Sequence, residues 1–227
     1  SNINLLRKER NNSEVYTLDP LVNKKMIEHI REAKKAKNTV GGQVECHVIN
    51  MPIGIGSCDQ WKNKLDSRIA GAVMGIQGIK AVEIGLGSEV GDVFGSMVHD
   101  EFLNYNIDKL NDECKGTFFM RKTNRAGGIE GGMSNGMPLI IKATMKPIST
   151  IPTGLQSLNL KTGKSEISDY ERSDTCAVPA ASVILESVIT FEVAKSLLES
   201  IGGENINDVK QNYNMRLDSR INGKFNY

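Results

Sequence analysis

Three segments of the sequence combine residue types that could bind a ligand or move a proton. The first, Asn124–Gly136, has five glycines in thirteen residues. Glycine lets a backbone approach a flat or phosphorylated ligand closely, and it also forms tight turns where no ligand binds. The segment lacks the GKS/T of a P-loop and precedes a predicted strand rather than a helix, so it matches neither the P-loop nor the dinucleotide fingerprint. Ligand contact and a purely structural role both stay open.

The second and third segments carry charged and hydroxyl groups. Lys146–Thr150 places a cation, two hydroxyls and free amides at a predicted strand end. These donors suit a phosphate or a polar ring edge, and a solvated strand end explains them equally well. Arg172 and Asp174 are two residues apart and could lie on one side of an extended segment. They could bind an anion and transfer a proton, or form a surface ion pair worth at most about 1 kcal/mol.

Neither the histidines nor the cysteines have the spacing of a metal site. No cysteine pair has the CxxC form common in zinc sites, so no metal is expected and the thiols are expected to be reduced. The histidines share no spacing and are expected at the surface or half-buried rather than in catalysis. The residues concerned are Cys46, Cys58, Cys114 and Cys176, and His29, His47 and His99.

Composition excludes several classes of protein. Hydrophobic residues make up 39% and charged residues 24% of the 227 residues, as in an ordinary soluble globular chain. The formal net charge is +1, so no overall positive field would drive nucleic-acid binding. The sequence has no run of about eighteen apolar residues that would predict a membrane span. The first residues lack the apolar core of a signal peptide, which predicts a cytoplasmic protein.

The elements that must position the three segments are a mixture of helices and strands. Pro20 after Asp19 predicts a helix start, and period-two alternation predicts a strand over 43–49. The sequence further predicts helices at 59–74, 179–201 and after 208, strands at 79–85 and 137–145, and polar loops at 100–125 and 152–170. Residues 1–18 and 212–227 are predicted to be frayed. This order predicts a single α+β domain over 1–227 rather than a regular parallel α/β sheet.

The same segments resemble, in order, the signature sequences of the chorismate synthase family. RSDTCAVPAASVILES is similar to the family's C-terminal signature, and NRAGGIEGGMSNG followed by KPISTI is similar to its second hallmark. The stretches GGQVECHVINMPIGIG, AVEIG and HDEF also match in order. The resemblance covers the chain from around Asp19 to Val209. Three ordered motifs make it far more specific than a lone glycine pattern.

The resemblance implies a carbon–oxygen lyase of the shikimate pathway, which leads to aromatic amino acid biosynthesis. Such an enzyme converts 5-enolpyruvylshikimate 3-phosphate to chorismate by 1,4-elimination of phosphate, and it requires reduced FMN although the reaction has no net redox change. The resemblance also implies a cytoplasmic homotetrameric flavoprotein, associated with NADP, with no nucleic-acid or membrane partner. Its implied fold is α+β, a β-α-β sandwich with helices between antiparallel sheets.

By motif, the resemblance assigns roles to residues in several parts of the chain. It implies that Asp174 is catalytic and assists proton removal close to the flavin. The implied FMN-binding residues are Gln77, Gly78, Gly131, Lys146, Pro147, Ile148, Ser149, Thr150 and Arg172.

The chain departs from the family pattern in length. Family members are longer and carry a Gly-x-Ser-His-Gly segment and an arginine-rich segment, which supply two catalytic histidines and most arginines for the substrate phosphate. Neither segment is in this sequence, so the chain is expected to be the C-terminal portion of a truncated chorismate synthase-like fold, inactive alone. The alternative is a non-catalytic binding or oligomerisation module that retains this scaffold. A generic flavin-dependent oxidoreductase is a third option that no dinucleotide motif supports.

Overall fold

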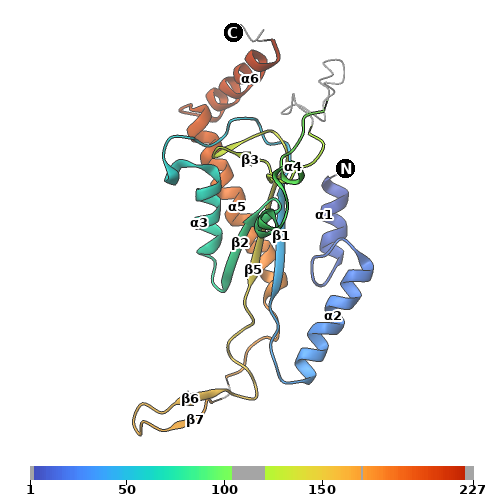
Figure 1. The fold of residues 1–227 in the computed structure, drawn as a ribbon, viewed down its shortest axis with the longest axis vertical. Helices are drawn as coiled ribbons and strands as arrows, with labels where there is room; N and C mark the ends of the chain where they lie inside the picture. Colours follow the sequence, from blue (N-terminus) through green and yellow to red (C-terminus); the bar gives the residue numbers. More distant parts are fainter. Residues whose placement is uncertain (1–2, 104–120, 170, 223–227) are drawn as a thin grey trace. The chain divides into compact units, whose positions relative to one another are not determined.

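The computed structural model describes residues 3–103, 121–169 and 171–222 of the chain (Figure 1). Its backbone contacts group into two compact units, each assembled from stretches far apart in sequence. The first unit comprises Ser1–Val44, Gln77–Ala81 and Thr144–Ile184, and the second comprises Glu45–Ile76, Val82–Ala143 and Leu185–Tyr227. The single domain expected over 1–227 stays a prediction.

Helices occupy both ends of the described chain, where the sequence predicted frayed residues. Helix α1 spans Ile3–Asn12 and helix α6 spans Ile206–Asn222, and α6 falls where the sequence predicted a helix after 208. The fraying expected at 1–18 and 212–227 stays a prediction. The two stretches are polar, yet they contain strong helix formers such as Leu, Lys, Arg and Gln. Helix α1 was missed because of this polarity, although helix propensity does not require an apolar sequence.

Helix α2 spans Pro20–Lys35 and begins as the sequence predicted. The Asp19 carboxylate accepts hydrogen bonds from the backbone N–H groups of Leu21 and Val22, at 2.7 and 3.2 Å. Pro20 stands at the start of the helix, where a missing N–H costs nothing. A local capping signal thus fixes the start of α2.

The three longer strands form one sheet in the order β1-β5-β2. They span Gly42–Val48 (β1), Leu139–Met145 (β5) and Ile79–Ile84 (β2), close to the predicted bounds. Strand β5 alternates strictly between buried and half-buried residues. Strands β2 and β5 are antiparallel, because the Gly85 N–H donates to Ile140 O and the Lys146 N–H donates to Gly78 O, both at 2.9 Å.

Apolar residues four apart on two helices contribute to the core of the second unit. Helix α3 spans Leu65–Met74 and buries Leu65, Ile69 and Val73 completely. A short 3-10 helix, η1 (Trp61–Asn63), occupies the start of the single helix that was predicted over 59–74. Helix α5 spans Val178–Ile201 and buries Leu185 and Ile189. The four-residue spacing places one face of each helix in the core.

Two hairpins complete the described structure, together with short helical turns. Strands β3 and β4 pair antiparallel inside the glycine-rich segment, and β6 pairs antiparallel with β7. The second hairpin falls within 152–170, where the sequence predicted only a polar loop. All six residues of β6 and β7 are exposed, so no burial alternation marked them as strands. The remaining bounds are η2 (Gly87–Asp92), α4 (Gly95–Val98), β3 (Ile129–Glu130), β4 (Met133–Ser134), β6 (Gln156–Leu158) and β7 (Ser165–Ile167).

The mixture of helices and small sheets confirms the predicted α+β class. Most of the polar loop predicted over 100–125, with Cys114, lies outside the described residues. No helix in the described ranges is long and apolar enough to cross a membrane.

Candidate functional site

The predicted site residues fall in both units. Gln77, Gly78, Lys146–Thr150, Arg172 and Asp174 belong to the first unit, whereas Gly131 belongs to the second. Each group is described within its own unit.

The C-terminal end of β5 contacts two other segments of the first unit. The Lys146 N–H donates to Gly78 O at 2.9 Å, which brings two predicted site residues together. Gly41 approaches the same place, since a Cβ built on it would lie 2.4 Å from Met145 O and 2.8 Å from Pro147 N. Only glycine leaves room for this contact. The residues on either side of the strand end are therefore fixed by backbone packing.

Two further contacts hold the strand-end segment, Lys146–Thr150. The Thr39 hydroxyl donates to Ile148 O at 2.6 Å, and the Ser173 hydroxyl donates to Thr150 O at 3.0 Å. Ser173 stands between Arg172 and Asp174, so this bond places the predicted arginine and carboxylate beside the strand-end segment. Sequence reasoning missed Thr39. Its only local signal is a hydroxyl residue between the end of α2 and two glycines.

Several polar groups in and beside the strand-end segment have no partner among the residues that the structure describes. The N–H groups of Ile148, Ser149 and Thr150 make no hydrogen bond there. The same holds for the charged or hydroxyl groups of Lys146, Ser149, Thr150, Arg172 and Asp174. The surface ion pair considered for Arg172 and Asp174 is thus not formed in this described region.

This donor set fits the phosphate end of a flavin nucleotide. A phosphate offers several acceptor oxygens, and free amides, hydroxyls and two cations are groups that bind it. Lys146, Ser149 and Arg172 are exposed, so a ligand could reach them. The side chains of Gln77 and Asp174 are also exposed. Thr39 and Ser173 would act indirectly, by holding the carbonyls that orient the segment.

Gly131 lies at the tip of the β3–β4 hairpin in the second unit. Gly131 and Gly132 have φ values of 60° and 86°, which a two-residue hairpin turn of the primed type requires. A Cβ built on Gly131 would have nothing within 4 Å, whereas one on Gly132 would lie 2.5 Å from Ser57 O. The open side of Gly131 therefore leaves space for a ligand to reach its backbone.

Asp100 binds the backbone turn that leads into this hairpin. Its carboxylate accepts hydrogen bonds from the Thr123 hydroxyl at 2.6 Å and from the N–H groups of Arg125 and Ala126 at 2.8 and 2.9 Å. Burial acts to raise the pKa of Asp100, but the bonds from Thr123, Ala126 and Arg125 outweigh it, so the pKa lies below its usual value. The carboxylate is therefore ionised at neutral pH.

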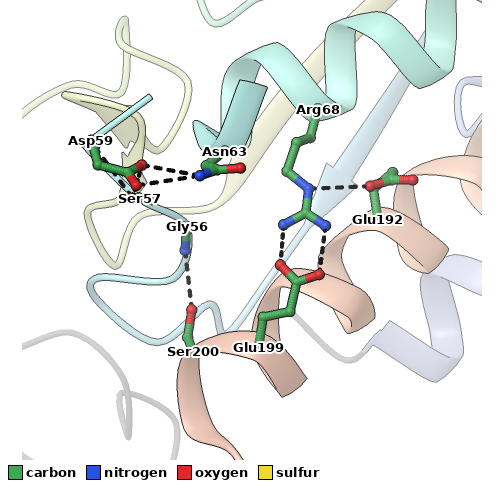
Figure 2. A network of polar contacts seen from close by, with 8 residues as sticks. All are labelled: Gly56, Ser57, Asp59, Asn63, Arg68, Glu192, Glu199 and Ser200. Carbon is green, nitrogen blue, oxygen red and sulfur yellow. Dashed lines mark hydrogen bonds and ion pairs between the residues drawn. The ribbon is translucent and has the colours of Figure 1, made fainter. Parts of the chain in front are cut away.

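An ion-pair network joins α3 to α5 in the second unit (Figure 2). The Arg68 guanidinium binds both carboxylate oxygens of Glu199, with one Nη2–Oε1 distance of 3.0 Å, and its Nε lies 3.5 Å from Glu192. The Glu199 hydrogen bond is the main cause of a raised pKa for Arg68 and a lowered pKa for Glu199. The network borders a hollow of about 480 Å³, and none of the predicted site residues lines it.

The histidines and cysteines of the described residues form no metal cluster. His47 pairs with Glu45, and His29 lies 3.9 Å from Glu32. Both side chains are exposed, as is that of His99. The free cysteines in the described ranges are Cys46, Cys58 and Cys176.

The fold and the donor set define an α+β protein with an exposed strand-end segment suited to an anion. The family model for chorismate synthase matches residues 1–198. The chain is 46% identical over 213 residues to the chorismate synthase of Geobacter metallireducens, covering 94% of this chain and 54% of that protein. It is 44% identical over 207 residues to that of Bacillus pumilus, covering 91% and 51%. The chain belongs to the chorismate synthase family.

A solved structure supports the same conclusion. The chain matches a crystal structure of chorismate synthase with a TM-score of 0.77 and 34% sequence identity, covering 96% of this chain and 55% of that one. The predicted family and fold class are thereby confirmed. The chain spans about half the length of the curated relatives it matches, so the activity of a whole enzyme does not follow from the match alone.

Proposed function

We propose that this chain is part of a chorismate synthase that eliminates phosphate from 5-enolpyruvylshikimate 3-phosphate to give chorismate, with reduced FMN. The family membership supplies the reaction class. The observation that supports a flavin site is the unpaired donor set at Lys146–Thr150 and Arg172. Its members lie in one unit, where the Lys146 N–H donates to Gly78 O and the Ser173 hydroxyl donates to Thr150 O.

The flavin site would draw on backbone and side chains in different ways. Lys146, Ser149, Thr150 and Arg172 would hold the flavin phosphate through charge-assisted hydrogen bonds. Pro147 and Ile148, which lie between Lys146 and Ser149 in the sequence, would pack against the ligand. Bound reduced FMN would supply an electron transiently and recover it, which explains a redox cofactor in a reaction without net redox change.

Gln77, Gly78 and Gly131 would contact the flavin chiefly through the backbone. Gly78 has a φ of 84° and Gly131 has a φ of 60°, so both adopt a conformation that favours glycine. Gly131 also has open space beside its Cα. A side chain at Gly78 or Gly131 would displace a flat ring from the backbone.

Asp174 is the proposed proton acceptor. In the 1,4-elimination, the C–O bond to phosphate and a ring C–H bond break, the new double bond forms, and the proton passes to a base. The Asp174 carboxylate is exposed, and it makes no ion pair or hydrogen bond with other described residues, so no partner occupies its acceptor oxygens. A carboxylate with free oxygens beside the flavin phosphate site can accept this proton.

We further propose that the enzyme is a cytoplasmic homotetramer, associated with NADP, and that the 227 residues alone do not turn over substrate. The relatives are about twice as long, and the segments with the catalytic histidines are not in this sequence. Normal turnover by the 227-residue chain with reduced FMN and substrate would contradict this proposal. A chain that binds neither FMN nor substrate would favour the non-catalytic module instead.

Arg172→Ala tests the flavin site directly. In the complete enzyme, FMN affinity, measured by quenching of flavin fluorescence, should fall about tenfold or more, because a hydrogen bond to a charged group contributes about 1.5–3 kcal/mol. Arg31→Ala is the matched control, since Arg31 is an exposed arginine of α2 in the same unit. Equal affinities for the two variants would remove Arg172 from the site.

A further inference from the structure

Asp100 is the one buried charged side chain among the described residues, with 8% of its surface exposed. It follows the short helix α4 and belongs to the second unit. Its two oxygens accept three hydrogen bonds, all from residues 123–126, at 2.6–2.9 Å. A buried carboxylate is costly unless its acceptor sites are filled, and here they are filled by a single turn.

The turn that Asp100 binds is fixed on its other side by Gly85 and Leu86, which lie between β2 and η2. The Arg125 N–H donates to Asp100, while the Arg125 carbonyl accepts from the Leu86 N–H at 2.8 Å. Gly85 also packs against this turn, since a Cβ on Gly85 would lie 2.1 Å from the Arg125 carbonyl oxygen. The backbone at Arg125 therefore has no freedom to shift toward Gly85.

The placement of this turn determines the placement of the glycine-rich hairpin that follows it. The Gly127 backbone lies against Gly85, with a Cβ position 2.3 Å from the Gly85 nitrogen. One residue further, the Gly128 carbonyl accepts from the Asn135 N–H at 2.9 Å. Gly128 and Asn135 flank the β3–β4 hairpin, so a displaced turn would displace the hairpin and Gly131 at its tip.

We propose that Asp100 is a positioning residue that fixes the glycine-rich hairpin, so that the open backbone face of Gly131 is presented to the flavin. This proposal rests on the proposed function, because it assigns Gly131 to the flavin site. Asp100 itself touches neither flavin nor substrate. It acts through the Thr123 hydroxyl and the amides of Arg125 and Ala126.

Asp100→Asn is the informative variant. The asparagine oxygen can still accept from two donors, but its amide group would meet the N–H of either Arg125 or Ala126 as a second donor. Asp59→Asn is the matched control, because Asp59 accepts from the Ser57 hydroxyl and the Gln60 N–H in a local turn of the same unit. Ile69→Val, in the core of α3, supplies a general loss of stability for comparison.

Hydrogen exchange supplies the first measurement. Amides of residues 127–136 do not bond to Asp100, so their exchange reports a transmitted effect. Under native conditions Asp100→Asn should speed their exchange about tenfold or more, as expected when a buried donor loses its acceptor. Asp59→Asn and Ile69→Val should leave the ratio of exchange in this segment to exchange in α5 unchanged. Exchange that rises no more in Asp100→Asn than in Ile69→Val would overturn the proposal.

FMN affinity supplies the second measurement. For chains of equal folded fraction, Asp100→Asn should weaken FMN binding about tenfold, and the two controls should bind like the wild type. Unchanged affinity with faster exchange would overturn the link to the flavin. A complete enzyme that binds no FMN would overturn the proposed function, while hydrogen exchange would still decide whether Asp100 positions the hairpin.

Discussion

Replacing Gly131 with alanine separates a ligand-contact role from a turn role. Gly131 has a φ of 60°, and a Cβ built on it would meet no atom within 4 Å. The cost to folding is therefore only that of a non-glycine residue in the left-handed region, about 1–2 kcal/mol. For a chain of this size we expect the thermal midpoint to fall by about 2–8 °C.

Gly163 is a matched control for this substitution. It has a φ of 68°, lies in the β6–β7 turn, and also has open space around its Cβ position. Gly163→Ala should lose similar stability and keep normal FMN affinity. Gly131→Ala should weaken FMN binding about tenfold, because its methyl group would occupy the space through which the flavin reaches the backbone.

Gly85→Ala tests the steric part of the reasoning. Its φ of 62° resembles that of Gly131, but its Cβ would lie 2.1 Å from the Arg125 carbonyl oxygen, which is backbone and cannot rotate away. We expect a loss well above that of Gly131→Ala, about 3 kcal/mol or more. Equal midpoints for Gly85→Ala and Gly131→Ala, measured by calorimetry, would refute this account. Equal FMN affinities for Gly131→Ala and Gly163→Ala would refute the ligand contact.

Three further predictions concern the chemistry and the stability of the chain. In an active form of the protein, Asp174→Asn should lower turnover about 10²–10⁴-fold with a much smaller change in FMN affinity; parallel losses would contradict a proton-transfer role. Ser196→Ala should keep or raise the thermal midpoint, because the buried Ser196 hydroxyl has no hydrogen-bond partner among the described residues, whereas Ser182→Ala should lower it by removing a 2.7 Å bond to Pro179 O. The lowered pKa of Asp100 should make its contribution to stability complete above about pH 3.9, the unfolded value, and lost as the pH falls through the folded value; the midpoints of wild type and Asp100→Asn should therefore converge as the pH falls below the unfolded value.

The parts of the fold that the sequence predicted are those with local physical signals. Helix α2 was predicted because Asp19 caps it and Pro20 starts it. Helix α5 was predicted because its apolar residues recur along its length and Gly202, with a φ of 72°, ends it. The hairpin at 152–170 was missed because its strands are exposed on both faces and show no apolar alternation. Helix α1 was missed because its residues are polar, although they favour a helix.

The site could be predicted from the sequence to a smaller extent than the fold. The residue types of Lys146–Thr150 and Arg172 were readable, and the family resemblance gave them roles. The contacts that orient these residues could not be predicted from the sequence, because Thr39 lies 109 residues from Ile148, and Ser173 lies 23 residues from Thr150. Pairing over such distances depends on the complete fold, and a single sequence carries no local trace of it.

The surroundings of Arg172 and Asp174 bear on the two explanations that the sequence left open. A surface ion pair would have used both charges and offered at most about 1 kcal/mol of stability. Instead, Ser173 ties the segment to Thr150 through its hydroxyl, while the two flanking charges make no bond with other described residues. This arrangement leaves a cation and a carboxylate available for the anion binding and proton transfer that we propose, and this is why the decisive substitutions are Arg172→Ala and Asp174→Asn.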